Sequence, residues 1–410
     1  MCIRDRYNAL DWIDAHQEKI EDRLFRDRYV DVKPEIFLYD VSSSYLEGTK
    51  NELAGFGYNR DGKKGKKQIV FGLLTDEEGW PVSIECFQGN TQDPMTFKSQ
   101  IEKIKHRFGC ERITMVGDRG MIKSGQIEAL QGHGFYYITA ITKPQIDTLL
   151  DQGIIQMELF GEELCEIEYN DVRYILRRNP VRAKELEDIR KSKIEKIKAL
   201  IHERNQYLNT HPRAVVPVAV SLVKEFIERL KLTSFLHVKI EGRVLSLICD
   251  DDALDEAIHL DGCYVIKSNV PRDAVQKEIL HERYKDLAFV ESAFRDMKTT
   301  ELEVRPVHVR KASRTRGHVF IVMLSYFISK YLHEKWAAFD LTVEEGVKEL
   351  STICCIETHV GAVAYNQIPT PRDLGLQLIN SLNITLPPAI QCRGIHVATR
   401  KKLNLKRKNQ

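Results

Sequence analysis

The chain has 410 residues and a mass of 47.4 kDa, which is more than one ordinary core needs and predicts two or three domains. Hydrophobic residues make up 43% of the chain and charged residues 29%, a balance that excludes disordered, collagen-like and coiled-coil proteins. Lys and Arg number 61 against 59 Asp and Glu, so the net charge gives no sign of a nucleic-acid partner. Any basic surface has to be local.

The cysteines and the apolar segments predict a protein of the cytoplasm. Nine cysteines are scattered without a Cys-x-x-Cys pair, which is typical of free thiols in a reducing compartment. The best apolar stretch, residues 318–332, is interrupted by Ser325, Ser329 and Lys330, so it predicts a buried helix and no membrane partner. The first residues lack a signal-peptide pattern and open directly into a helical one, so we expect a chain that is truncated at its N-terminus.

The first 142 residues alternate between strand and helix patterns. Residues 7–29 look like the end of a helical unit, and the buried apolar run at 36–39 predicts the first strand. Two further strands, 68–74 and 81–87, flank a turn that contains Gly79 and predict a β-hairpin. The remaining pattern predicts, in order, a helix at about 94–108, a strand at 112–116, a helix from about 124 and a strand at 135–142. This order predicts a mixed α/β layer.

Beyond residue 142 the pattern changes. Alternating segments at 165–169 and 174–178 flank Asn170-Asp171 and predict a second hairpin. A highly charged helical run follows at 182–206, and strand-like alternation returns at 235–249, so we expect an inserted β-rich domain.

Apolar residues 264–266 then restore the first rhythm. A long helix, from about Arg272 or His281 to Met297, and a helix over about 317–334 are predicted after them. The predicted domains are a helical N-terminal remnant (1–30), an α/β domain (31–142 and 263–335), a β-rich insertion (143–262) and a helical C-terminal region with a basic tail (336–410).

Two aspartates follow predicted strands. Asp40 comes directly after residues 36–39, and Asp118 follows residues 112–116 with only Gly117 between. If these strands are neighbours in one sheet, their carboxylates converge at its edge, where α/β folds bind ligands. Taken separately, each aspartate is more often a turn or capping residue.

A third carboxylate is predicted on a helix. Tyr284, Glu291 and Lys298 are spaced seven residues apart, which is nearly two helical turns, so we expect them to share one face. Three carboxylates without a histidine cluster suit Mg²⁺, which takes carboxylates together with phosphate oxygens of a substrate. Two such ions, about 4 Å apart, activate an attacking oxygen and stabilise a leaving oxygen at phosphorus. The predicted chemistry is cutting or joining phosphodiester bonds.

At these residues the chain resembles bacterial insertion-sequence transposases of the DDE superfamily, which have a ribonuclease H-like catalytic domain. More closely, it resembles the branch with a β-rich insertion and a Tyr-x2-Arg-x3-Glu-x6-Lys helix, matched here by Tyr284, Glu291 and Lys298. The arginine position is Leu287, a departure from the pattern at one phosphate contact. The resemblance covers roughly residues 30–340 and includes the stretches 38–48, 89–91, 116–120 and 305–319.

The resemblance implies a ribonuclease H-like α/β fold and a metal-dependent mechanism. Hydrolysis at the ends of the mobile element frees 3′-hydroxyls, which then attack target DNA. Asp40, Asp118 and Glu291 would hold two Mg²⁺ ions, with Mn²⁺ as a substitute. The implied partners are double-stranded DNA, as inverted-repeat ends and as target, and a second copy of the chain in a homodimer, near the bacterial nucleoid. The residues expected to contact DNA are Tyr284, Arg295, Lys298, Arg119, Arg305, Arg310 and Lys311.

Several charged segments have a plainer alternative. Residues 295–316 carry seven cations against three acids, which favours a phosphate-binding stripe, with a solvated face as the alternative. Lysines 63, 64, 66 and 67 are as typical of a solvated turn as of a phosphate-binding segment. The helical run at 182–206 carries both signs and favours a scaffold, and the tail at 401–408 is either a DNA contact or a disordered terminus. Ser42–Ser44 strengthen a capping role for Asp40.

Three rival functions stay open on the sequence. An actin-like ATP-binding protein shares the sheet order but needs a glycine-rich phosphate loop, and none follows Asp40. An inactive transposase-derived DNA-binding protein fits the expected truncation and Leu287, whereas the three carboxylates argue against it. A ribonuclease H-like nuclease or resolvase would not require the insertion or the Tyr-Glu-Lys helix. The sequence therefore favours a DDE transposase, an enzyme of the polynucleotidyl transferase type.

Overall fold

A computed structural model describes residues 3–299, 302–360 and 363–390. The chain forms two compact units, one up to Val322 and the other from Met323 onward. Helix α10 (Ala312–Lys335) runs across this boundary. Among the described helices, none combines the length and the apolar character that a membrane crossing requires.

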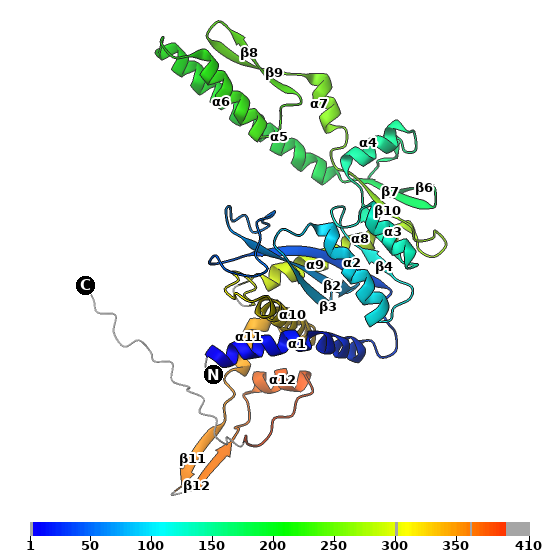
Figure 1. The fold of residues 1–410 in the computed structure, drawn as a ribbon, viewed down its shortest axis with the longest axis vertical. Helices are drawn as coiled ribbons and strands as arrows, with labels where there is room; N and C mark the ends of the chain where they lie inside the picture. The colour runs from blue at the N-terminus through cyan, green and yellow to red at the C-terminus, as the bar shows by residue number, and fades with distance from the viewer. Residues whose placement is uncertain (1–2, 300–301, 361–362, 391–410) are drawn as a thin grey trace, which may run out of the picture. The chain divides into compact units, whose positions relative to one another are not determined.

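The first unit is built on one mixed sheet of eight strands (Figure 1). Strands β1, β4 and β5 are parallel neighbours, and the other neighbouring pairs are antiparallel. This arrangement confirms the predicted mixed α/β class. In sheet order the strands are β3 (Pro81–Phe87), β2 (Gln68–Asp76), β1 (Ile36–Tyr45), β4 (Thr114–Val116), β5 (Tyr136–Ala140), β10 (Cys263–Ser268), β7 (Val172–Arg178) and β6 (Cys165–Tyr169).

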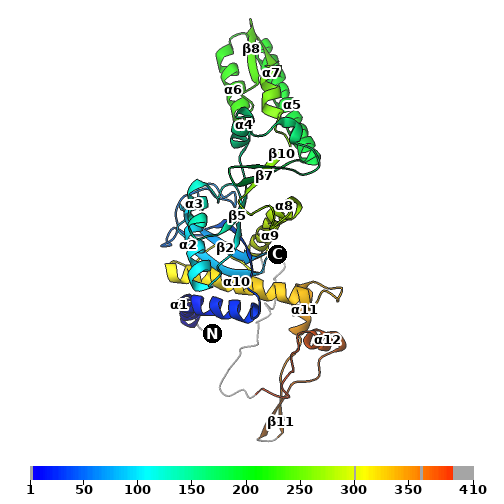
Figure 2. The ribbon, with the colours of Figure 1, turned by 90° about the vertical axis from the view of Figure 1, so that its right-hand side faces the viewer.

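Alternation along β1 separates the two faces of the sheet. Phe37 and Tyr39 point into a large apolar core, so Leu38 and Asp40 between and after them point to the opposite face. Helices cover both faces, as Figure 2 shows, with α2 and α3 on one side and α8 and α9 on the other. Their bounds are α2 (Asp93–Glu102), the π-helix η1 (Lys103–Arg107), α3 (Ser124–Gly132), α8 (Lys277–Lys285) and α9 (Leu287–Met297).

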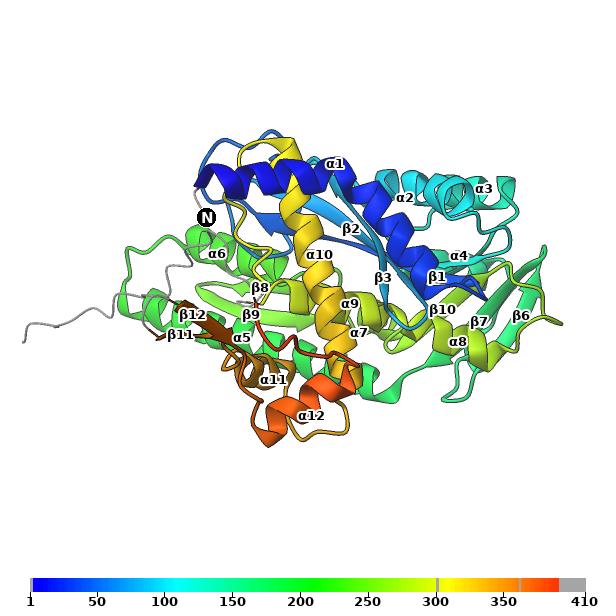
Figure 3. The same cartoon turned by 90° about the horizontal axis from the view of Figure 1, so that it is seen from below.

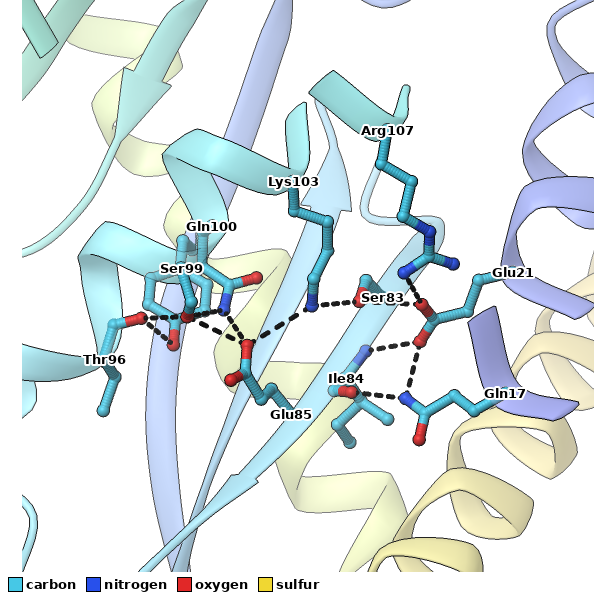
Figure 4. Close-up of polar contacts among 11 residues, drawn as sticks. Gln17, Glu21, Ser83, Ile84, Glu85, Thr96, Ser99, Gln100, Lys103 and Arg107 are labelled. Atoms are coloured by element: carbon cyan, nitrogen blue, oxygen red, sulfur yellow. Dashed lines mark hydrogen bonds and ion pairs between the residues drawn. The ribbon is translucent and has the colours of Figure 1, made fainter. Parts of the chain in front are cut away.

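Helix α1 (Ile3–Arg28) covers the outer edge of the sheet along β3 (Figure 3). An edge strand exposes unpaired backbone groups, and here α1 supplies partners for those of Ile84. The Gln17 side chain donates to the Ile84 carbonyl at 2.7 Å, and Glu21 accepts from the Ile84 N–H at 3.3 Å. The Glu21 side chain is fully buried and also receives the Ser83 hydroxyl at 3.1 Å and Arg107 at 2.8 Å (Figure 4). Glu21 therefore joins α1 to both β3 and η1.

Removing this buried carboxylate should weaken the fold. Glu21→Ala leaves the Ile84 N–H and the Ser83 hydroxyl without their acceptor and Arg107 without its buried ion pair, so we expect a loss of about 3 kcal/mol in the free energy of unfolding. Urea unfolding measures it. The control is Arg23→Ala, which breaks an exposed pair with Asp27 and should cost under about 1 kcal/mol. Equal losses in the two variants would contradict the role given to Glu21.

Residues 143–262 are not β-rich, contrary to the expectation from their alternating pattern. Strands β6 and β7 extend the main sheet because β7 pairs with β10 along its length. The rest is mainly helical: α5 alone has 31 residues, and it packs with α6 and a small hairpin around an apolar cluster. The elements are α4 (Lys143–Asp151), the 3-10 helix η2 (Met157–Leu159), α5 (Pro180–Thr210), α6 (Val216–Arg229), β8 (Leu236–Glu241), β9 (Val244–Cys249) and α7 (Asp251–Ile258).

The described part of the second unit mixes helices with a hairpin, so the predicted helical C-terminal region is correct only in part. Trp336 is its central buried side chain: the indole N–H donates to the Leu378 carbonyl at 3.4 Å, and Gly346 packs against the ring. The elements are α11 (Val343–Leu350), β11 (Ile356–Val360), β12 (Val363–Gln367) and α12 (Asp373–Ser381). The basic tail at 401–408 lies outside the described residues.

Candidate active site

Asp40 lies within β1 and not after its end. The sequence-based expectation of a strand ending at Tyr39 is wrong, because β1 continues to Tyr45 in register with β2. Ser42–Ser44 are therefore buried strand residues and do not form a helix cap. The neighbouring strand β4 is shorter: its last pair with β1 is Leu38 with Val116. Asp40 thus stands two residues beyond the last parallel pair.

Asp118 lies opposite Asp40 by register. The pairing of Leu38 with Val116, carried two residues further, places Asp118 beside Asp40 on the same face. Asp118 opens a turn, and its Oδ1 accepts from the N–H groups of Gly120 at 2.9 Å and Met121 at 2.8 Å. One carboxylate oxygen therefore fixes the turn after β4, and the side chain as a whole is exposed.

Glu291 approaches the same face from α9. Phe294 of this helix packs edge-on against Phe71, at 5.6 Å between ring centroids, and Phe71 is paired with Ser42 of β1. Ser42 shares a face with Asp40 because the two are separated by two strand residues. Glu291, one turn before Phe294, is exposed and stands on this side of the sheet.

The electrostatics show that the three carboxylates act on one another. Burial, with the negative charge of Asp118 and a smaller contribution from Glu291, raises the pKa of Asp40 to about 7. The N–H of Val41, which donates to Asp40 Oδ1 at 2.7 Å, and the nearby cation Arg60 oppose this rise.

The helix that carries Glu291 is shorter than predicted. The expected single helix up to Met297 is divided at Asp286 into α8 and α9. Tyr284, at the end of α8, still belongs to the site: burial raises its pKa to about 12, and the charges of Asp118 and Glu291 act in the same direction. Leu287, at the signature's arginine position, is buried as the first residue of α9.

Lys298 does not share a pocket with Glu291. It follows the end of α9, and its ammonium contacts Asp61 Oδ1 at 3.0 Å. Arg305 donates to the same oxygen at 2.7 Å, and the other Asp61 oxygen accepts from the Tyr45 N–H at 3.1 Å. Burial lowers the pKa of Lys298, and the Asp61 carboxylate opposes that shift. Lys298 is therefore held by a buried acid, and its expected place on the face of Glu291 stays a prediction.

A pocket opens on the α8 side of Asp118 and Glu291. Arg119 and Tyr284, which the sequence predicts to contact DNA, line this pocket. Two further cations, Lys143 and Lys285, also border it and were not singled out from the sequence. The pocket is thus lined by acidic and basic side chains together. Such a lining favours a ligand that carries negative charge and is also bound by cations.

The basic segment at 295–316 is divided between two tasks. Arg314 pairs with Asp11 at 3.1 Å and Arg316 with Asp14 at 2.8 Å, so these two cations attach α1 to α10. Three remaining cations of the predicted stripe are exposed and make no ion pair with any residue in the described ranges: Arg295, Arg310 and Lys311. The stripe is therefore smaller than its sequence suggests.

Arg60 and Asp61 are site residues that sequence reasoning missed. Both lie in the connection between β1 and β2, where only the lysines were considered. Arg60 pairs with Asp93 at 2.7 Å, and its backbone N–H donates to the Ser43 hydroxyl at 3.2 Å. No local pattern predicts that Asp61 meets Lys298, since the two are 237 residues apart.

The donor set fits a divalent cation chemically, although its groups are not gathered into a closed cage. Within residues 3–299, 302–360 and 363–390, no three Asp, Glu, His or Cys side chains meet closely enough to hold a metal ion. Asp118 Oδ1 is engaged in its own turn. Hard carboxylate oxygens on one face, one of them with a pKa raised by burial and by like charge, suit Mg²⁺ or Mn²⁺.

The fold and site define an α/β protein with an acidic centre on one face of a mixed sheet. Residues 31–328 match the family described as Transposase DDE domain, and the chain belongs to that family. A search among curated proteins finds no match.

Two solved structures are similar to the chain. The first is a cryo-EM structure of the piggyBac transposase synaptic complex with hairpin DNA, at 8% identity and a TM-score of 0.40, covering 77% of this chain and 52% of that one. The second is the Mos1 transposase paired-end complex with the left transposon end, at 11% identity and a TM-score of 0.19, covering 30% and 41%. The chain therefore spans about half the length of the piggyBac chain in this comparison.

The raised pKa of Asp40 predicts a pH-dependent stability. An unfolded aspartate has a pKa of about 3.9, so its ionisation in the folded chain is penalised, and the free energy of unfolding falls as pH rises towards and through about 7. We expect a fall of about 2.5 kcal/mol between pH 5 and 8 relative to Asp40→Asn, measured by urea unfolding in EDTA. Parallel curves for the two proteins would exclude the shift.

Proposed function

We propose that this chain is a DNA transposase of an insertion sequence, which hydrolyses phosphodiester bonds at the element's ends and transfers the freed 3′ strands to target DNA. The observation that carries the proposal is the set of carboxylates from β1, the β4 turn and α9, in which burial and the negative charges of Asp118 and Glu291 raise the pKa of Asp40 to about 7. Membership of the Transposase DDE domain family supports the same reaction.

In this mechanism Asp40, Asp118 and Glu291 hold two divalent cations, Mg²⁺ with Mn²⁺ as substitute. When bound, these ions supply activation of the attacking oxygen and stabilisation of the leaving oxygen. Asp40 gives up its proton on loading, because its pKa lies near 7 and a ligand carboxylate has to be ionised. Asp118 keeps Oδ2 for coordination while Oδ1 holds the turn.

The surrounding side chains position the substrate. Tyr284 stays protonated at neutral pH, since its pKa is about 12, and it donates a hydrogen bond to DNA. Arg119, at the pocket's edge, binds a phosphate next to the reacting one. Lys298 and Arg305 support the site through Asp61, and Arg295, Arg310 and Lys311 contact more distant phosphates.

The proposed partners follow from this reaction. Double-stranded DNA binds twice, as inverted-repeat ends and as target, and two copies of the chain act together on paired ends. The protein works at the nucleoid in the bacterial cytoplasm. A catalytically inactive DNA-binding relic is the main alternative, and it is a rival because the departure at Leu287 removes a signature cation. The three carboxylates and the raised pKa favour an active centre.

Charge-neutral substitutions test the centre. Asp40→Asn, Asp118→Asn and Glu291→Gln each keep the shape of the side chain but remove a metal-holding charge, so each should lower DNA strand cleavage with Mg²⁺ by about 100-fold or more. A gel assay with a labelled DNA end measures this, after circular dichroism establishes that each variant is folded. Glu303→Gln, an exposed acid in the same basic segment, is the control. A folded Glu291→Gln protein that cleaves at the parent rate would sink the assignment.

The basic segment makes a separate prediction about DNA affinity. Arg295→Ala and Arg310→Ala should each reduce the slope of log K against log salt by about one unit, because each removes one exposed cation. Arg314→Ala is the matched control, since its guanidinium is already paired with Asp11 and its slope should stay at the parent value. Fluorescence anisotropy over a salt series gives the slopes. If Arg295→Ala and Arg310→Ala leave the slope unchanged, the exposed cations are a solvated face.

A further inference from the structure

Two aromatic side chains stand in water beside the carboxylates. Phe56 and Tyr58, in the connection of residues 46–67 between β1 and β2, are 64% and 82% exposed. A ring of this size stabilises a fold mainly by leaving water, so rings this exposed add little to the stability of the chain. Their exposure indicates a surface kept for a binding partner.

The backbone beneath the rings is firmly held. Gly55 forms a bridge with Gln68, through N–H to carbonyl distances of 3.1 and 2.9 Å. Gly57 lies so close to Gly89 that an added Cβ would be 2.4 Å from its carbonyl oxygen. Phe56 and Tyr58 flank Gly57, and both side chains are exposed. Because the rings are already presented, little conformational entropy is lost when a ligand covers them.

Cations surround the two rings. The Lys67 ammonium is 5.7 Å from the centroid of the Phe56 ring, and the Arg60 guanidinium is 5.8 Å from that of Tyr58. Lys63 and Lys64 follow within six residues of Tyr58 and are exposed. Exposed aromatic rings among lysines are the combination with which proteins bind single-stranded nucleic acid: the rings stack on bases and the cations follow the phosphates.

The same segment reaches the acidic centre. Two residues after Tyr58, the backbone of Arg60 donates to Ser43 of β1, and its charge acts on Asp40. Asp61 then accepts from Tyr45 at the end of β1 and from Lys298 after α9. Two residues span at most about 7 Å, so the Tyr58 backbone lies close to the segment that borders Asp40.

We propose that Phe56 and Tyr58 form a stacking platform for unpaired bases of the DNA strand next to the phosphodiester that is cut, with Lys63 and Lys64 on its phosphates. The proposal rests on the proposed function, since it takes DNA as the substrate. Bases in an intact duplex stack on one another and offer no free face. The platform therefore selects a frayed or flipped nucleotide and shows little preference among the four bases.

The test uses the full chain in EDTA, which prevents cleavage, and two DNA probes. One is a fully paired duplex, and the other carries an unpaired 2-aminopurine, whose fluorescence is quenched on stacking. Phe56→Ala and Tyr58→Ala should each raise the Kd for the unpaired probe about tenfold and abolish the quenching, with the duplex Kd within twofold of the parent. Tyr58→Phe should behave as the parent does. Tyr365→Ala, an exposed tyrosine of the second unit, is the control.

A cleavage assay separates failure of this proposal from failure of the proposed function. If Asp40→Asn cleaves DNA normally, the proposed function fails. If Asp40→Asn is inactive but Phe56→Ala and Tyr58→Ala bind and quench the unpaired probe as the parent does, the platform alone is overturned. The third outcome is a protein interface: a dimer that dissociates on either alanine substitution without DNA, seen by sedimentation, also overturns it.

Discussion

Burial of a carboxylate next to other negative charges is the constraint on which this site depends. Asp40 is buried on the face of the sheet that Asp118 and Glu291 also approach, and burial, reinforced by their negative charges, raises its pKa to about 7. Such a centre is tolerable only with cations nearby. The chain supplies them from different directions: Arg60 from the loop after β1, Arg119 from the turn after β4, and Lys143 from the start of α4. Folding therefore places positive side chains around a group of negative ones.

The length of β4 decides where this centre lies. It pairs with β1 over three residues only, and the turn that Asp118 opens diverts the chain directly afterwards. If β1 and β4 had stayed paired further along, both aspartates would lie in regular strands. Their backbone N–H and C=O groups would then be hydrogen-bonded between the strands. Because β1 continues alone beside β2, Asp40 remains on a rigid strand while Asp118 sits on a turn. One carboxylate is thus held by a strand and the other by a hydrogen-bonded turn.

Local patterns predicted most of the sheet, and distant contacts account for what was missed. The hairpin of β6 and β7 followed from Asn170-Asp171, whose positive φ angles of 51° and 57° suit a tight turn. The continuation of β1 was missed because Ser42–Ser44 are polar, although they are buried and hydrogen-bonded in the strand. The two aspartates could be found because each follows an apolar run. Asp61 could not, since the two cations that it pairs with lie more than two hundred residues away.

Asp61 has a consequence for how the protein meets polyanions. Its single carboxylate pairs with both Lys298 and Arg305, so it offsets one of their two positive charges, and its side chain is almost fully buried. A cation that keeps its internal partner contacts no phosphate, and so displaces none of the counterions condensed on a nucleic acid. Such paired cations also attract dissolved anions less strongly than unpaired cations do. Lys298 and Arg305 therefore place positive charge near the acidic centre, while their pairing with Asp61 weakens its effect on the solvent. Selectivity for an anionic ligand there depends on geometry and not on long-range attraction.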